Sequence, residues 1–148
     1  MKLTEVKGDI FAQDRECMIQ CVSADFKLGA GIAKEFSNRF GVRDKPLRRY
    51  GTDYGKFFLR DGGGALVTED PLVINLVTKE HYYDKPTYDT MLVSLMQAAM
   101  LCEIWEVFEV SMPLIGCGLD RLEWERVRKL IEKAFNGLNM MITVYRKE

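Results

Sequence analysis

Short continuous apolar runs alternate along the chain with segments in which apolar residues recur at helical spacing. The runs are brief and rich in β-branched residues, a pattern typical of buried strands. Strands are predicted at Leu3–Val6, Met18–Val22, Leu72–Val77, Val107–Met112 and Met141–Tyr145. The Met18–Val22 run is continuous enough in apolar character to lie centrally in a sheet.

The segments with helical spacing predict helices at Gly31–Phe40, Asp44–Tyr50, Pro86–Trp105 and Arg121–Phe135. Gly41 stands where a helix C′ residue is expected, because glycine adopts the left-handed backbone that ends many helices. Met91 and Met96 recur with the apolar residues of the Pro86–Trp105 segment. We expect these methionines to belong to the core rather than to a binding surface.

Two further apolar pieces, Lys56–Leu59 and Ala65–Thr68, flank the stretch Arg60–Gly64. Three consecutive glycines in that stretch predict a hairpin with a flexible tip. The alternation of strands and helices elsewhere predicts an α/β fold. Because the hairpin and a terminal strand interrupt the βαβ rhythm, we expect a mixed sheet covered by helices on both faces.

The composition fits a single intracellular domain spanning residues 1–148. The chain has 21 basic and 22 acidic residues, so no net field favours nucleic acid or an anionic membrane. It has neither an apolar signal core at its start nor a run as long as a membrane span. We therefore expect a cytoplasmic protein, which in a eukaryote could also be nuclear, without direct nucleic-acid or membrane binding.

The cysteines and the single histidine argue against a metal site. Cys17, Cys21, Cys102 and Cys117 form no paired C-x-x-C pattern, and His81 is the only histidine. This disfavours both a zinc site and a cysteine–histidine catalytic pair. Cys17 and Cys21 are four residues apart in a predicted strand, so they share one face and are expected to be buried thiols.

The stretch from Ser111 to Trp124 joins a predicted strand to a predicted helix through Gly116 and Gly118. Glycine permits backbone conformations that a Cβ would forbid, and ligands of α/β sheets bind at such strand ends. Asp120 has two interpretations here. It could cap the helix in a capping box with Glu123, or it could supply a carboxylate to a site.

Similar glycine-marked turns occur at Gly8-Asp9 and at Gly29-Ala30-Gly31. Together with Gly116–Gly118 they could converge at the carboxyl ends of the strands and present backbone donors to phosphates. The alternative is that these glycines simply end secondary-structure elements. A dinucleotide-binding fingerprint is disfavoured, because Lys34 occupies its third glycine position.

Lys79 follows the predicted strand Leu72–Val77. A partly desolvated lysine at this place would have a lowered pKa and a nucleophilic amine able to attack a sugar carbon. The alternative is a solvated lysine in a loop. His81, two residues further on, could be a base or a surface residue, and the sequence offers it no recognisable partner.

With these residues assembled, the chain resembles the macro domains, and among them the branch of terminal ADP-ribose protein glycohydrolases. The resemblance runs nearly end to end and rests on motifs in the family's order. They are Val6–Phe11, Cys21–Asp25, Leu28–Ala33, Leu76–Lys79, Lys85–Tyr88, Met112–Trp124 and Ile142–Tyr145. The resemblance implies a three-layer α/β/α domain with a mixed, mostly parallel central sheet and an ADP-ribose cleft.

Residue roles follow from the resemblance by position. It implies Lys79 as the nucleophile at the anomeric carbon of the distal ribose, and Asp120 as the residue that helps to resolve the adduct. The implied ADP-ribose contacts are Asp9 at the adenine amino group with Ile10 beside it, Ser23, Gly29, Gly31 and Ile32 on the distal ribose side, Gly116, Cys117, Gly118 and Leu119 around the diphosphate, and Thr78 and Pro113.

The resemblance implies a hydrolase that removes ADP-ribose from glutamate and aspartate esters and deacylates O-acyl-ADP-ribose. No metal or cofactor is implied, ADP-ribose is ligand or product, and a monomer is expected. The alternatives are a reader that binds ADP-ribose without turnover and a phosphatase acting on ADP-ribose 1″-phosphate. Leu114 replaces a residue that is often basic in relatives, and Glu103–Glu109 is unusually acidic, which bears on the partner rather than on the catalytic pair.

Overall fold

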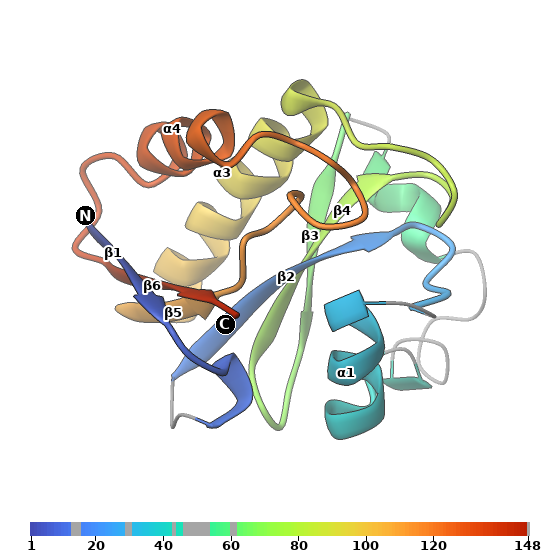
Figure 1. Ribbon diagram of the computed structural model, residues 1–148, viewed down its shortest axis with the longest axis horizontal. Helices are drawn as coiled ribbons and strands as arrows, with labels where there is room; N and C mark the ends of the chain where they lie inside the picture. Colours follow the sequence, from blue (N-terminus) through green and yellow to red (C-terminus); the bar gives the residue numbers. More distant parts are fainter. Residues whose placement is uncertain (13–15, 29–30, 43, 46–53, 60–61, 148) are drawn as a thin grey trace.

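The structure is a computed structural model that describes residues 1–12, 16–28, 31–42, 44–45, 54–59 and 62–147. One six-stranded sheet runs through it in the order β1-β6-β5-β2-β4-β3 (Figure 1). The strands are β1 (Lys2–Lys7), β2 (Cys17–Ser23), β3 (Gly64–Thr68), β4 (Val73–Lys79), β5 (Glu109–Met112) and β6 (Met141–Arg146). Neighbouring strands are parallel except for β3, which pairs with β4 in antiparallel fashion, so the predicted mixed and mostly parallel sheet is confirmed.

Helices cover both faces of this sheet. They are α1 (Gly31–Phe40), α3 (Tyr88–Ile104) and α4 (Trp124–Ala134), with 3-10 turns η1 (Ile10–Ala12) and η2 (Tyr54–Leu59). Helices α3 and α4 pack on one face and α1 on the other (Figure 1). The three-layer α/β/α architecture expected from the sequence is therefore confirmed.

Strand β2 shows how the sequence makes two cores from one sheet. Alternate side chains point to opposite faces of a strand. Cys17 and Ile19 accordingly join the core under α3 and α4, whereas Met18 and Val22 join the core under α1. Cys17 is fully buried and Cys21 partly so, and both are free thiols as predicted.

The prediction for residues 56–64 is wrong. Residues 56–59 lie in η2 rather than in a strand, and the hairpin partner of β3 is β4. The glycines are not a flexible tip, since a Cβ on Gly63 or Gly64 would come within 2.7 Å of the Ser94 hydroxyl or 2.6 Å of the Phe58 carbonyl oxygen. Close packing against α3 and η2 explains Gly63 and Gly64, whereas Gly62 has open space around it and a φ of +88°. Of the helix predicted at Asp44–Tyr50, residues 44 and 45 are helical and the remainder lies outside the described residues.

Two predictions about helices also need correction. Met91 is fully buried as expected, but Met96 is 52% exposed, because it lies on the face of α3 turned away from the sheet. The last helix begins at Trp124 rather than at Arg121, since Arg121 has a φ of +61°, which an α-helix cannot contain.

No α-helix of the described residues is both long and apolar enough to cross a membrane.

Candidate active site

Lys79 and Asp120 meet at the carboxyl edge of the sheet. Lys79 is the last residue of β4, and Asp120 lies in the loop that follows β5. The Lys79 Nζ atom is 2.5 Å from Asp120 Oδ1, and the two side chains are 13% and 14% exposed. The sequence could not establish this contact across 41 positions. It places an amine and a carboxylate in direct contact within a largely shielded site.

Asp120 does not cap the helix that follows it. The N-cap of α4 is Glu123, and no side chain caps that end. The capping-box interpretation of Asp120 and Glu123 is therefore wrong. Because the left-handed Arg121 separates Asp120 from the helix, the carboxylate is left free to turn toward Lys79.

Strand pairing and hydrogen bonds hold the end of β2 beside Lys79. Ser23 is buried and pairs in register with Lys79, and its hydroxyl donates to Asp25 Oδ1 at 2.5 Å. Asp25 also accepts hydrogen bonds from the amides of Lys27 and Tyr82. Burial opposes ionisation of Asp25, but the hydrogen bonds from Ser23, Tyr82 and Lys27 outweigh it and lower the pKa of this carboxyl. Asp25 thus ties the loop after Lys79 to the end of β2.

Sequence reasoning did not select Asp25 as a site residue. The available signal was a short polar side chain two positions after Ser23, just past a buried strand, where such residues commonly bind nearby backbone amides.

Backbone hydrogen bonds within the loop hold the segment between β5 and α4 in its conformation. The amides of Ile115, Cys117, Arg121 and Leu122 donate to carbonyl groups of the same loop. The amides of Gly118, Leu119 and Asp120 find no acceptor among the described residues. Three successive free donors at the end of a strand form a suitable site for an anionic group.

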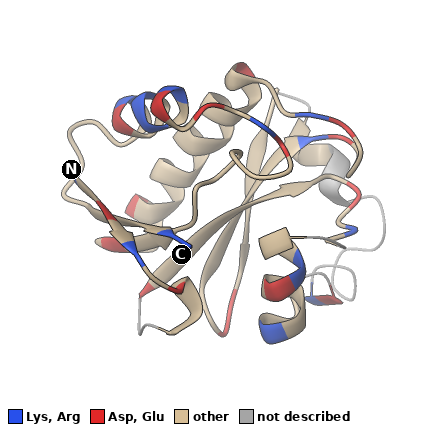
Figure 2. Cartoon of the chain, in the orientation of Figure 1, with Lys and Arg blue, Asp and Glu red and all other residues tan. Residues whose placement is uncertain are grey.

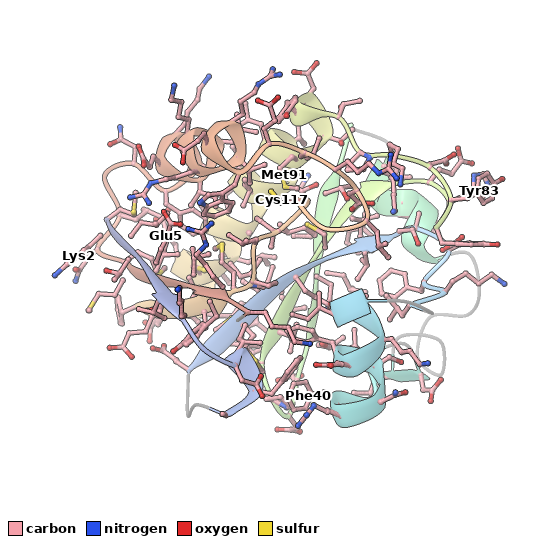
Figure 3. The ribbon with its side chains drawn as sticks, viewed as in Figure 1. Lys2, Glu5, Phe40, Tyr83, Met91 and Cys117 are labelled. Atoms are coloured by element: carbon pink, nitrogen blue, oxygen red, sulfur yellow. The ribbon has the colours of Figure 1, made fainter. Side chains whose placement is uncertain are left out.

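The backbone conformation and the surrounding space require a glycine at position 116 but not at position 118. Gly116 has a φ of +73°, and a Cβ there would lie 2.7 Å from Met91 Cε, the side chain that Figure 3 shows near Cys117. Gly118 has open space around it and no positive φ, so the expectation that its backbone forbids a Cβ is wrong.

Gly116→Ala is therefore expected to destabilise the fold by about 1–3 kcal/mol, because alanine is strained in the left-handed region and must displace Met91. Gly118→Ala is the matched control and should change the unfolding free energy by less than about 0.5 kcal/mol. Urea unfolding of both variants measures the difference. Equal losses in the two variants would contradict this account of the loop.

Residues at the start of α3 support the same loop from outside. The Lys85 Nζ atom donates to the Leu119 carbonyl at 2.6 Å, and the amide of Glu123 donates to the Tyr88 hydroxyl at 2.9 Å. The Arg126 guanidinium lies 3.7 Å from the centre of the Tyr88 ring. These contacts fix the loop on both sides of Asp120.

The two cysteines near Lys79 and Asp120 are neutral at physiological pH. Burial, followed by the nearby Asp120 carboxylate, raises the pKa of the Cys117 thiol to about 11. Burial and the same carboxylate also raise the pKa of Cys21. Since the thiolate is the nucleophilic form, neither thiol is activated as a nucleophile at neutral pH.

The other predicted ligand contacts are spread along the same edge. Asp9 follows β1 and accepts a hydrogen bond from the Phe11 amide, with Ile10 buried beside it. Four strand spacings separate β1 from β4, or roughly 19 Å, so an elongated ligand is needed to reach from Asp9 to Lys79. Thr78 is buried, and its hydroxyl has no hydrogen-bond partner among the described residues.

The remaining predicted residues border the Lys79 end of this edge. Gly31 begins α1 with a φ of +60°, and a Cβ on it would lie 3.6 Å from Leu119 Cδ1, so α1 approaches the loop after β5. Leu119 and Ile32 are exposed, whereas Pro113 is buried directly after β5. Gly29 lies outside the described residues.

His81 is separate from the pair formed by Lys79 and Asp120. Its Nδ1 atom lies 3.1 Å from Asp84 Oδ2, and its ring stacks on Tyr83 with centroids 5.0 Å apart. The partner that the sequence did not reveal is therefore Asp84. Within the described ranges, no group of three or more histidine, cysteine, aspartate or glutamate side chains could hold a metal ion.

Comparison with known proteins places this geometry in a family. No protein-family model matches the chain. The ADP-ribose glycohydrolase OARD1 of Bos taurus is 38% identical over 146 residues, which cover 97% of this chain and 91% of that protein, and the Homo sapiens protein gives the same values. The DNA ADP-ribosyl glycohydrolase of Mycobacterium tuberculosis is 27% identical over 92% of this chain and 39% of its own length.

Solved structures agree on the fold. The macrodomain of Thermus aquaticus DarG superposes with a TM-score of 0.79 at 19% identity, covering 97% of each chain. Thermosipho africanus DarTG in complex with ADP-ribose gives a TM-score of 0.77 at 19% identity over 98% of this chain and 41% of that one. The chain belongs to the macro domain family, in its terminal ADP-ribose glycohydrolase branch.

Proposed function

We propose that this protein is a hydrolase that releases ADP-ribose from glutamate and aspartate side chains, with Lys79 as its nucleophile. The observation that carries the proposal is the 2.5 Å contact between Lys79 Nζ and Asp120 Oδ1 beside unoccupied backbone donors. The relatives named ADP-ribose glycohydrolase support the same class of reaction.

The ligand is proposed to lie along the carboxyl edge of the sheet. Asp9 would accept the adenine amino group at one end, because a carboxylate is an acceptor suited to an exocyclic amine. The free amides of Gly118, Leu119 and Asp120 would bind the diphosphate. This orientation leaves the distal ribose at Lys79, between Ser23 and the loop that carries Asp120.

The first step transfers the sugar from its carboxylate to the lysine. Asp120 takes a proton from the Lys79 ammonium group, and the Nζ electron pair forms a bond to the anomeric carbon. The bond from that carbon to the acceptor oxygen breaks, and the acceptor leaves as a carboxylate with the bonding electrons. A carboxylate is a good leaving group, so this ester is the weak bond of the substrate.

The second step returns the enzyme to its starting state. The lysine adduct opens its sugar ring to an imine, the ring oxygen takes up a proton, and water adds to the imine carbon with Asp120 moving the protons. The carbon–nitrogen bond then breaks, releasing ADP-ribose and the lysine amine. The scheme balances without a metal, a cofactor or an oxidant. O-acyl-ADP-ribose is the second proposed substrate, and the same two steps release its acyl group as a carboxylate where that group is carried on the anomeric oxygen.

The test is a release assay combined with borohydride trapping. The wild-type protein is expected to release ADP-ribose from a glutamyl-ADP-ribosylated peptide, and borohydride should reduce the imine to a stable adduct that mass spectrometry maps to Lys79. Full activity without any adduct on Lys79 would rule out the lysine mechanism.

Tight ADP-ribose binding without release would identify a reader instead. Release from ADP-ribosylated DNA but not from the peptide would contradict the proposed acceptor, and phosphate release from ADP-ribose 1″-phosphate that survives Lys79→Ala would favour a phosphatase.

Asp9→Ala is expected to weaken ADP-ribose binding by about ten- to hundred-fold, since a hydrogen bond to a charged group contributes about 1.5–3 kcal/mol. The rate of release at saturating substrate should stay within about twofold of the wild type, because Asp9 lies at the opposite end of the edge from Lys79. Calorimetry and steady-state kinetics measure the two quantities. Unchanged affinity would remove Asp9 from the ligand site.

A further inference from the structure

Helix α3 presents large apolar side chains to solvent as well as to the sheet. Met91, Leu95 and Cys102 are buried in the core beneath it. Met96 and Met100, at 52% and 61% exposure, and Ile104, at 70% exposure, follow one another at four-residue spacing on the outer side. Residues four apart in a helix lie on the same face, so these three side chains form one stripe about 12 Å long.

Two further large apolar side chains are exposed at and just after the end of the helix. Trp105 caps α3 and is 42% exposed, and Phe108 follows at 54% exposure. We refer to Met96, Met100, Ile104, Trp105 and Phe108 as the α3 apolar surface. Single exposed apolar residues are ordinary, but a cluster of five large ones, including two aromatic rings, is typical of an interaction site.

Carboxylates border this surface. Glu103, Glu106 and Glu109 are exposed at the end of α3 and the start of β5. Glu16 lies beside them, since its Oε1 atom accepts a hydrogen bond from the Phe108 amide at 3.4 Å. In the part of the chain that the structure describes, none of these four carboxylates forms a salt bridge. Helix α3 itself carries no lysine or arginine, as Figure 2 shows.

We propose that the α3 apolar surface binds an amphipathic helix of another protein, whose apolar stripe packs on Met96, Met100 and Ile104 and whose flanking lysines or arginines face the four carboxylates. Complementary charge selects such a partner. A second copy of this chain fits poorly, because a twofold contact through this face would bring both sets of carboxylates together. The proposal does not depend on the proposed function.

The position of the surface leaves the catalytic edge free. The C-terminal end of α3 precedes the start of β5 at Glu109, whereas Lys79 and Asp120 lie at the carboxyl ends of the strands. The N-terminal end of α3, by contrast, supports the loop of Asp120 through Lys85 and Tyr88. A helix docked at the far end of α3 would therefore hold the enzyme near a partner without covering the site.

The test uses the full chain and two synthetic helical peptides. The Leu/Lys peptide has leucines on one face and lysines on the other, and the Leu/Glu peptide has glutamates in place of the lysines. Amide chemical shifts are expected to change around Ile104 and Phe108 with the Leu/Lys peptide. The Met100→Gln/Ile104→Gln variant should bind it about tenfold more weakly or worse, as expected when central apolar contacts are lost. Unchanged thermal unfolding and ADP-ribose affinity would show that this variant is folded.

A matched pair of charge variants tests the carboxylates. Glu103→Lys should weaken binding of the Leu/Lys peptide severalfold, whereas Glu35→Lys, the same change on exposed α1, should leave it unchanged. Equal affinity for both peptides, no binding of either, or shifts confined to other surfaces would overturn the proposal. So would a concentration-dependent dimer that Ile104→Gln abolishes, because the occupant would then be a second copy.

Discussion

Replacement of Lys79 by alanine is expected to slow release of ADP-ribose from glutamyl esters by about a thousand-fold or more, as removal of a covalent nucleophile does. The variant also loses the borohydride-trapped adduct, because no other amine lies in contact with Asp120 among the described residues. Binding of free ADP-ribose should remain, since the proposed diphosphate donors are backbone amides of a different loop. Release kinetics, mass spectrometry and calorimetry measure these three outcomes.

A second variant separates lost chemistry from lost structure. Lys79→Ala leaves the 14% exposed Asp120 carboxylate without its cation, so part of any loss could come from a disturbed loop. Lys79→Arg keeps a positive charge at Asp120 but has no amine that becomes nucleophilic at ordinary pH. It should be as inactive as the alanine variant while unfolding like the wild type. Appreciable release by Lys79→Arg would mean that water, rather than the side chain, attacks the sugar.

Asp120→Asn is expected to reduce the rate by about a hundred- to ten-thousand-fold, the range typical of a lost general acid–base group. The amide keeps a polar group near Lys79 Nζ but cannot take its proton. A small external base such as imidazole should restore attack by the lysine, because it takes that proton in place of Asp120. Hydrolysis of the adduct should stay slow, so a larger fraction of the protein is trapped by borohydride than in the wild type.

The two variants therefore give opposite trapping results from the same catalytic pair. Lys79→Ala should yield no adduct, whereas Asp120→Asn with the external base should accumulate it. An Asp120→Asn enzyme with wild-type kinetics would show that the 2.5 Å contact is structural only. Loss of the trapped adduct with every external base tested would instead assign Asp120 to the attack step alone.

Most of the fold could be predicted from periodicity because the core strands are nearly continuous apolar runs. β2 and β4 are buried along almost their whole length, and such runs are recognisable without knowledge of their neighbours. The segment that includes Phe57 and Phe58 failed because a short apolar run fits a strand and a helical turn equally well. Gly63 and Gly64 were misinterpreted because the reasons for them are close contacts, of Gly63 with Ser94 of α3 and of Gly64 with Phe58 of η2.

Individual residues of the candidate site could be predicted from their places in the sequence, but the contacts between them could not. Gly116 and Lys79 could be singled out by their places at strand ends, yet only the resemblance to macro domains indicated that Lys79 and Asp120 act together. The capping motif at Asp120 was locally sound but failed because Arg121 adopts a left-handed backbone. Contacts of Lys85 and Tyr88 with this loop are tertiary, so no local pattern could have revealed them.

The ion pair at the edge of the sheet also bears on how the protein survives in a cell. An amine placed to react with a sugar carbon is a target for free reducing sugars, which would glycate it and end its activity. Lys79 is only 13% exposed, and its Nζ atom is in direct contact with Asp120 Oδ1. We therefore expect burial and the contact with Asp120 to make Lys79 react with free sugars more slowly than the exposed lysines of the chain.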